Sequence, residues 1–287
     1  MSFDLQDGQQ QRSGGTVQRG SRLTSLKIRG TWLFVLLFVY IATARASGPE
    51  FSTPNFRVVA LAEGGGIHQP FVEAAKVWLN KLALENNFAV DYIQNTDKID
   101  EAFLSRYQLF IQLNYPPYNW TPTAAAAFVK YIEEGRGGWI GFHHATLLGE
   151  FDGFKMWPWF SDFMGGIRFT GYVPTFADGT VSVEDTSHPT MQDVKAPFVV
   201  NAEEWYTWDK SPRPNVHVLA SVNENTYAPD TKTKMGGDHP VIWTNEHYKA
   251  RNIYIFMGHH PDLFENPAFA TIFRNSIFWA AGQKTNK

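Results

Sequence analysis

The stretch GWIGFHHA at residues 138–145 carries the most information about the fold of this chain. Its apolar half, residues 138–142, predicts a buried β-strand, and a sharp turn with His143 at its tip follows. In α/β enzymes this place, at the carboxyl end of a central strand, is where a nucleophile usually lies. Here the place is taken by an imidazole, and the chain contains no cysteine.

Strands and helices alternate along the chain before this stretch. Apolar runs at 56–62, 88–93 and 107–113 predict strands, and the segments 70–86, 97–104 and 121–134 predict helices between them, with Asp97 capping the second. This alternation predicts a parallel sheet with helices on both faces.

The pattern changes after residue 150. Runs at 167–184, 198–208, 216–223 and 241–246 have the spacing of antiparallel strands, and a last strand at 252–259 precedes a helix at 267–281. The sequence therefore predicts one α/β domain with an antiparallel β extension.

The N-terminal region predicts export. Residues 31–44 form an apolar run of signal-peptide length after a mildly basic segment, and Ala44-Arg45-Ala46 is an A-x-A cleavage site. We expect a secretory signal peptide over 1–46, with an uncleaved N-terminal anchor as the alternative. A short leader at 47–55, the main domain at 56–282 and a tail at 283–287 complete the predicted organisation.

Composition narrows the classes of partner. The chain has 287 residues, 44% of them hydrophobic, enough for one large domain. Without residues 1–46, which hold six basic and two acidic residues, 19 basic and 26 acidic residues give a net charge of −7. A domain with this negative charge argues against nucleic acid as a partner. The signal or anchor segment is the part of the chain that we expect to contact a membrane. The absence of cysteine suits a bacterial periplasm.

Histidines recur where predicted strands end. His68 follows the first strand, His143 and His144 follow the fourth, and His259 and His260 follow the last. A lone loop histidine usually makes one hydrogen bond, but carboxyl ends of parallel strands share one crevice, so these five can converge. Imidazole suits both proton transfer near neutral pH and metal ligation, and their repetition predicts a site.

Two further segments add candidates. In Glu203-Glu204-Trp205-Tyr206, strand alternation sends Glu204 and Tyr206 to one face, although both acids could equally be solvated at an edge. The turn around Asp238 and His239 is ambiguous between structure and binding. His68, His143, His259 and a glutamate could also hold a divalent ion such as zinc, but no local spacing is diagnostic and no cofactor is established.

Several blocks together resemble the ThuA-like family, named for trehalose utilisation and related in fold to class I glutamine amidotransferases. The matching blocks are GGWIGFHHA at 137–145, DTSHP at 185–189, EEWY at 203–206, VHVLAS at 216–221, GGDHPVIW at 236–243, FMGHHPDLF at 256–264 and IFWAAG at 277–282. The resemblance runs over residues 56 to 282 and implies a flavodoxin-like, class I glutamine amidotransferase-like sheet.

The resemblance also implies a role for the sharp turn at residues 141–145, which we call the elbow. His143 stands where an amidotransferase has its nucleophilic cysteine, and His260-Pro261-Asp262 stands near the place of its His-Pro-Glu. His259 is the histidine of the ThuA-like pattern, whereas His144 departs from the usual small residue. Imidazole cannot replace a thiolate in thioester-forming amide hydrolysis, so we expect no glutaminase activity.

The family's association with sugar catabolism, taken with the predicted signal peptide, implies an exported carbohydrate-metabolism enzyme. It would act as a hydrolase, lyase or isomerase on a (keto-)disaccharide or other glycoside, a small-molecule carbohydrate. His143 and His259 would exchange protons with the sugar, and Glu204 would orient or ionise one imidazole. Expected substrate contacts are His68, His144, Trp205, Tyr206, Asp238, His239 and His260.

Two other functions fit the same sequence: a non-catalytic sugar-binding or accessory module, and a metal-assisted hydrolase. The sequence leaves the substrate and the oligomeric state open, and a homo-oligomer is compatible with it.

Overall fold

The computed structural model describes residues 53–227 and 231–284. The predicted signal peptide and most of the leader lie outside the described residues. Within the described ranges, no helix combines the length and the apolar character that crossing a bilayer requires.

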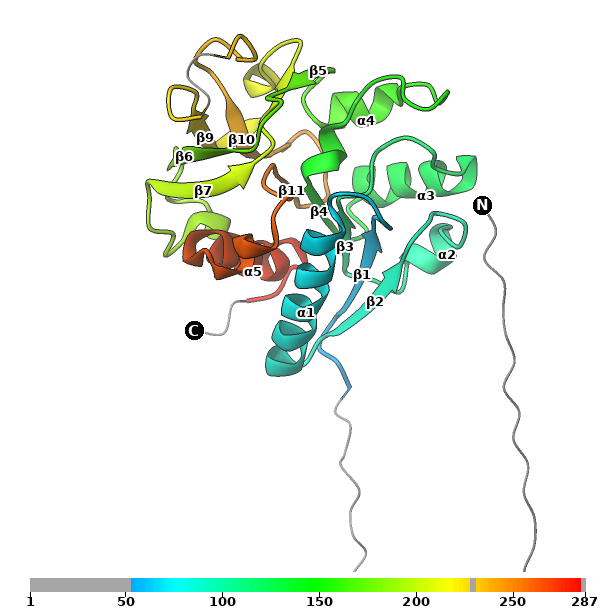
Figure 1. Cartoon of the computed structure of the whole chain (residues 1–287). Helices are drawn as coiled ribbons and strands as arrows, with labels where there is room; N and C mark the ends of the chain where they lie inside the picture. Colours follow the sequence, from blue (N-terminus) through cyan, green and yellow to red (C-terminus); the bar gives the residue numbers. More distant parts are fainter. Residues whose placement is uncertain (1–52, 228–230, 285–287) are drawn as a thin grey trace, which may run out of the picture. The chain divides into compact units, whose positions relative to one another are not determined.

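A nine-stranded mixed sheet forms the centre of the domain, in the order β2-β1-β3-β4-β11-β10-β9-β6-β7 (Figure 1). Its parallel half consists of β2 (Ala89–Ile93), β1 (Arg57–Ala62), β3 (Leu109–Leu113), β4 (Gly138–Phe142) and β11 (Asn252–Ile255). Its antiparallel half consists of β10 (Pro240–Thr244), β9 (His217–Asn223), β6 (Ala177–Val183) and β7 (Phe198–Glu203). The predicted α/β fold with an antiparallel extension is confirmed.

Helices cover both faces of the parallel half. The helices are α1 (Gln69–Asn86), α2 (Glu101–Leu104), α3 (Pro122–Glu133), α4 (Pro158–Phe163) and α5 (Pro267–Ala280). On one face, Phe142 of β4 packs against Phe71 of α1 and Phe273 of α5. On the other, Trp139 of β4 packs against Phe160 and Phe163 of α4. Because β4 is covered on both sides, all five of its residues are buried, which explains its unbroken apolar sequence.

Helix boundaries follow side-chain caps. Thr121 caps α3 by accepting a hydrogen bond from the backbone N–H of Ala124, and Asn266 caps α5 in the same way. The second helix begins later than predicted: Asp100, not Asp97, accepts from the N–H of Phe103 and caps α2.

Two predicted long strands are each divided in the structure. The run 167–184 forms β5 (Phe169–Tyr172) and β6, with Pro174 between them, and proline cannot donate to a strand ladder. The run 198–208 forms β7 and β8 (Tyr206–Trp208), which are separated by Glu204 and Trp205, and Ala202 near the end of β7 has a left-handed backbone with φ of 49°. β5 and β8 pair as a separate two-stranded sheet. Helix α4, which precedes β5 and begins at Pro158, was not predicted.

Candidate functional site

The chain turns sharply after β4, as predicted, and places His143 at the tip. His143 has φ of 35°, an unusual value for a residue with a side chain, and opens the short 3₁₀ helix η1 (His143–Thr146). The backbone carbonyl of His143 fixes the turn, because it accepts hydrogen bonds from the Tyr254 hydroxyl at 3.0 Å and from the Thr146 hydroxyl at 3.1 Å. Both hydroxyls are buried, so the elbow is a fixed feature of the core.

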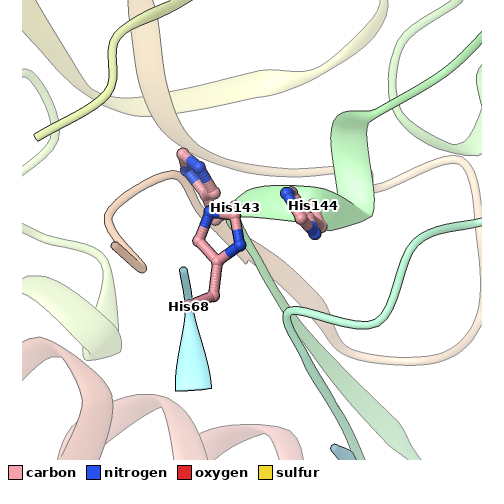
Figure 2. A group of neighbouring side chains, drawn as sticks. All are labelled: His68, His143 and His144. Atoms are coloured by element: carbon pink, nitrogen blue, oxygen red, sulfur yellow. The ribbon is translucent and has the colours of Figure 1, made fainter. Parts of the chain in front are cut away.

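Four histidines meet beside this elbow. The His68 ring lies 5.2 Å from the His143 ring, 4.1 Å from the His144 ring and 4.5 Å from the His259 ring, measured between centroids. Figure 2 shows the His68 ring beside those of His143 and His144. His68 occupies the cap position of α1 but makes no side-chain cap hydrogen bond, so its ring is available to the cluster.

Three carboxyl groups surround the histidine cluster. Glu63, in the turn after β1, places Oε1 3.2 Å from Nδ1 of His144 and Oε2 3.6 Å from Nδ1 of His68. Glu203 and Glu204 approach the two nitrogens of His143: Glu203 Oε1 is 3.7 Å from Nδ1, and Glu204 Oε2 is 3.4 Å from Nε2.

Burial sets the charge state of the cluster. Burial and the neighbouring histidines lower the pKa of His68 and of His143 well below the ordinary value, and burial lowers the pKa of His259. Burial also raises the pKa of Glu204, and it raises that of Glu203 to about 8, although backbone N–H groups donate to this carboxyl. The three imidazoles are therefore neutral at pH 7, and each offers one nitrogen lone pair.

The hydrogen bonds show which nitrogens are free. Nδ1 of His143 lies 3.2 Å from the carbonyl oxygen of Phe256, which can only accept, so this nitrogen carries the proton and Nε2 is bare. Within the cluster, four buried ring nitrogens lack a hydrogen-bond partner among the described residues: Nε2 of His68, His143 and His259, and Nδ1 of His144.

Two overlapping groups of these side chains have the arrangement of metal ligands. His68, His143 and His144 form one group, and His68, Glu204 and His259 form the other. Within each group, one ligand atom per residue lies within 4.8 Å of the others. The cluster can therefore transfer protons, bind a cation, or do both.

A close backbone approach positions the cluster. Asn114, with φ of 57° at the end of β3, donates from Nδ2 to the carbonyl of Gly258 at 2.5 Å, and the Gly258 N–H donates to Glu203 at 3.1 Å. A Cβ at position 258 would lie 2.7 Å from Cβ of His143 and from Oδ1 of Asn114. Only glycine leaves room for His143 here.

The structure brings together most of the predicted site. All three predicted catalytic residues, His143, His259 and Glu204, lie in the cluster with His68 and His144. The Tyr206 ring is adjacent, 4.4 Å from the His143 ring, and its hydroxyl bonds to Glu204.

The other four predicted substrate contacts have different surroundings. Trp205 is fully buried and donates from Nε1 to the carbonyl of Ala177. Asp238 pairs with Arg213, and exposed His260 pairs with Asp262. His239 is buried against Glu224 and Tyr227. Trp205 fills the core because the strand ends at Glu203, so the two-residue alternation expected for this segment does not continue through it.

Sequence reasoning missed four members of the surroundings: Glu63, Glu203, Asn114 and Phe176. Glu63 and Asn114 follow strands β1 and β3, so the strand-end argument that found the histidines applies to them equally. Phe176, whose half-exposed ring lies 4.3 Å from that of His259, has no sequence signal, because it reaches the site from the segment between β5 and β6.

Comparisons with known proteins agree with this geometry. Residues 57–280 match the model of the ThuA family, described as trehalose utilisation. A ThuA-like protein of Bacteroides uniformis ATCC 8492 has a similar structure, with a TM-score of 0.70 and 32% identity over 79% of this chain and 92% of that chain. No curated protein matches the chain.

More distant structures share the fold alone. A ThuA-like protein of Parabacteroides merdae ATCC 43184 has a TM-score of 0.57 at 16% identity, over 82% of this chain and 92% of that chain. A GMP synthase protein of Thermoplasma acidophilum has a TM-score of 0.50 at 14% identity, over 79% of this chain and 94% of that chain. The sheet is thus shared with glutamine amidotransferase-like proteins. From the family match over most of its length, the chain belongs to the ThuA family, and its role is related to carbohydrates.

Proposed function

We propose that this protein is an exported enzyme that acts on a (keto-)disaccharide or other glycoside by acid–base chemistry of His143, His259 and Glu204. Family membership supports a carbohydrate substrate. The observation that carries the enzymatic part is the meeting of these three side chains at the carboxyl ends of β4, β7 and β11, where α/β enzymes place their reactive groups. The signal-like sequence of residues 1–46 supports export.

His143 is the candidate general base. Its Nδ1 donates to the carbonyl of Phe256, so the bare Nε2 accepts a proton, and burial keeps the ring neutral by lowering its pKa. His143 takes a proton from the sugar or from an attacking water and becomes an imidazolium. This imidazolium then returns the proton to the departing oxygen, so the proton cycle is balanced.

His259 and Glu204 complete the proton-transfer set. His259 has an unpaired Nε2, and Glu204 lies 3.4 Å from Nε2 of His143 with a pKa raised by burial. His259 exchanges protons with the opposite side of the scissile or isomerising group, and Glu204 stabilises whichever imidazole becomes charged.

An exposed apolar ring borders the cluster. Phe176 lies against His259 with 52% of its surface exposed. Flat apolar rings suit the C–H face of a pyranose, while the histidines supply polar contacts. This combination supports a sugar as the substrate.

A turnover screen tests the proposal. Parent disaccharides and their 3-keto forms are incubated with wild type, His143→Ala, His259→Ala and the control His188→Ala, whose ring packs on Trp279 away from the cluster. Loss of a general acid or base lowers kcat by about 10²–10⁴ fold, so the first two variants should lose turnover and the control should keep it. Normal turnover by folded His143→Ala and His259→Ala would overturn the assignment.

The rival function is a non-catalytic sugar-binding module, which the exposed Phe176 ring favours. This function requires that wild type binds a sugar without forming product, and that Phe176 contributes to the affinity for that sugar. Calorimetric titration with Phe176→Ala alongside the turnover screen separates the two functions.

A further inference from the structure

We propose that the histidine cluster is a binding site for one divalent transition-metal ion of the zinc class, held by His68, His259 and Glu204. The proposal concerns the cluster of the proposed function but does not depend on the sugar reaction, because metal binding is measured without a sugar.

Several buried ring nitrogens of the cluster have no hydrogen-bond partner in the part of the chain that the structure describes, which indicates a place for a cation. Buried polar atoms almost always have hydrogen-bond partners, and those without one call for an explanation. Here, Nε2 of His68, His143 and His259 is buried and unpaired, and the three rings face a common region. Hydrogen bonds between neutral rings cannot satisfy several facing lone pairs at once, whereas a cation can accept all of them.

The donor set is the second argument. One ligand atom from each of His68, Glu204 and His259 lies within 4.8 Å of the others. Two histidines and a glutamate form a recognised catalytic zinc set, with bonds near 2.1 Å and therefore about 3.4 Å between ligand atoms. The distances between ligand atoms must therefore shorten by up to about 1.4 Å when an ion binds, which small side-chain rotations supply. Glu204 lies outside the regular strands, where such adjustment is easiest.

Outer contacts around the rings are the third argument. Metal-binding histidines usually give their second nitrogen to a carboxylate or a backbone carbonyl. Of the proposed ligands, His68 has Nδ1 3.6 Å from Oε2 of Glu63. The Tyr206 hydroxyl bonds to Glu204, which orients the carboxylate ligand. Each contact leaves the inner atom free for an ion.

The carboxylate decides between the two overlapping groups. The alternative set, His68, His143 and His144, has no negative ligand, whereas Glu204 partly neutralises the ion. With His259 and Glu204 as ligands, the ion takes over their part in the proposed chemistry, and His143 Nε2, 3.4 Å from the Glu204 carboxylate, stays free beside the ion as the proton acceptor. A bound ion would acidify water or polarise a sugar carbonyl there.

Metal titration tests the inference. Full-length protein is stripped with a chelator and titrated with Zn²⁺ and Co²⁺, with Mg²⁺ as the negative arm, and the visible cobalt bands report the ligand geometry. We expect one equivalent of Zn²⁺ or Co²⁺ and a raised Tm. His68→Gln, His259→Gln and Glu204→Gln should weaken binding by at least about 100-fold, whereas the control His188→Gln should not change it.

The outcomes separate clearly. The proposal is overturned if wild type takes up no stoichiometric Zn²⁺, or if folded Glu204→Gln and His259→Gln bind as wild type does. Loss of binding in His144→Gln with intact binding in Glu204→Gln would equally overturn it in favour of the other group. Zinc binding without sugar turnover would support the metal site and refute the proposed function, so the two failures are distinguishable.

Discussion

Gly258 is the position where a single methyl group should disturb the site most. It is squeezed between Cβ of His143 and Oδ1 of Asn114, each 2.7 Å from where a Cβ would lie. Carbon atoms in contact normally stay about 3.5–4.0 Å apart, so in Gly258→Ala the neighbours must move by roughly an ångström. His143 cannot yield freely, because it is fully buried and its carbonyl is fixed by two hydroxyls.

Two effects follow from this displacement. Overpacking a well-packed core costs about 1–3 kcal/mol, so Gly258→Ala should lower the free energy of unfolding by that amount. The backbone of Gly258 is not left-handed, so the whole cost comes from the clash. A shift of about 1 Å in His143 should also lower turnover by roughly 100-fold.

Urea unfolding followed by tryptophan fluorescence measures the first effect, and the turnover assay measures the second. Gly64→Ala is the matched control, since Gly64 is also a strand-end glycine but a Cβ there meets no heavy atom within 4 Å. Its unfolding free energy should stay within about 0.5 kcal/mol of wild type. If Gly258→Ala unfolds at the wild-type urea midpoint and keeps full turnover, the close approach does not position His143 and the reasoning fails.

Three other predictions concern the surroundings. Burial opposes ionisation of Glu224, but hydrogen bonds from His239 and from backbone N–H groups lower its pKa from 4.5 to about 2. The stability that the ionised carboxylate contributes is therefore fully present above pH 4.5 and should be lost as the pH falls towards 2. The loss should reach at most about 3 kcal/mol in acid titrations of wild type, and a Glu224→Gln variant that loses as much stability over this range would contradict it. Tyr254→Phe removes the buried hydroxyl that donates to the His143 carbonyl and should cost about 1–2 kcal/mol in urea unfolding; an unchanged midpoint would show that this bond is dispensable. Trp205→Phe should cost about 1–2 kcal/mol yet leave sugar affinity unchanged by calorimetry, because Trp205 is a core residue; weaker sugar binding by the folded variant would restore it as a substrate contact.

The parallel half of the fold was predictable because its physical signals are local. Each of its strands is an apolar run that ends at a turn, and each parallel neighbour shares the direction of β4. That geometry is enough to predict that His68, His143 and His259 meet at one edge of the sheet.

The antiparallel half was less predictable because its signals are not local. The separate pairing of β5 with β8 depends on contacts between segments more than thirty residues apart. Because this pairing takes the chain out of the large sheet after Glu203, the environment of Trp205 could not be read from alternation. The surroundings of His239 were unpredictable for a related reason, since its partners Glu224 and Tyr227 lie in another turn.

The break after β7 also explains how two consecutive carboxyl groups reach one imidazole. In a regular strand, Glu203 and Glu204 would point to opposite faces, but the chain leaves the large sheet after Glu203 to pair with β5. The two side chains therefore lie at the two nitrogens of His143. Their environments differ: Glu203 is fully buried and accepts backbone N–H groups, whereas Glu204 is partly exposed beside Tyr206. Unlike environments of neighbouring carboxyl groups separate their roles. Glu203 fits a group that fixes the loop bearing His259, and Glu204 fits the one that meets the substrate or the ion.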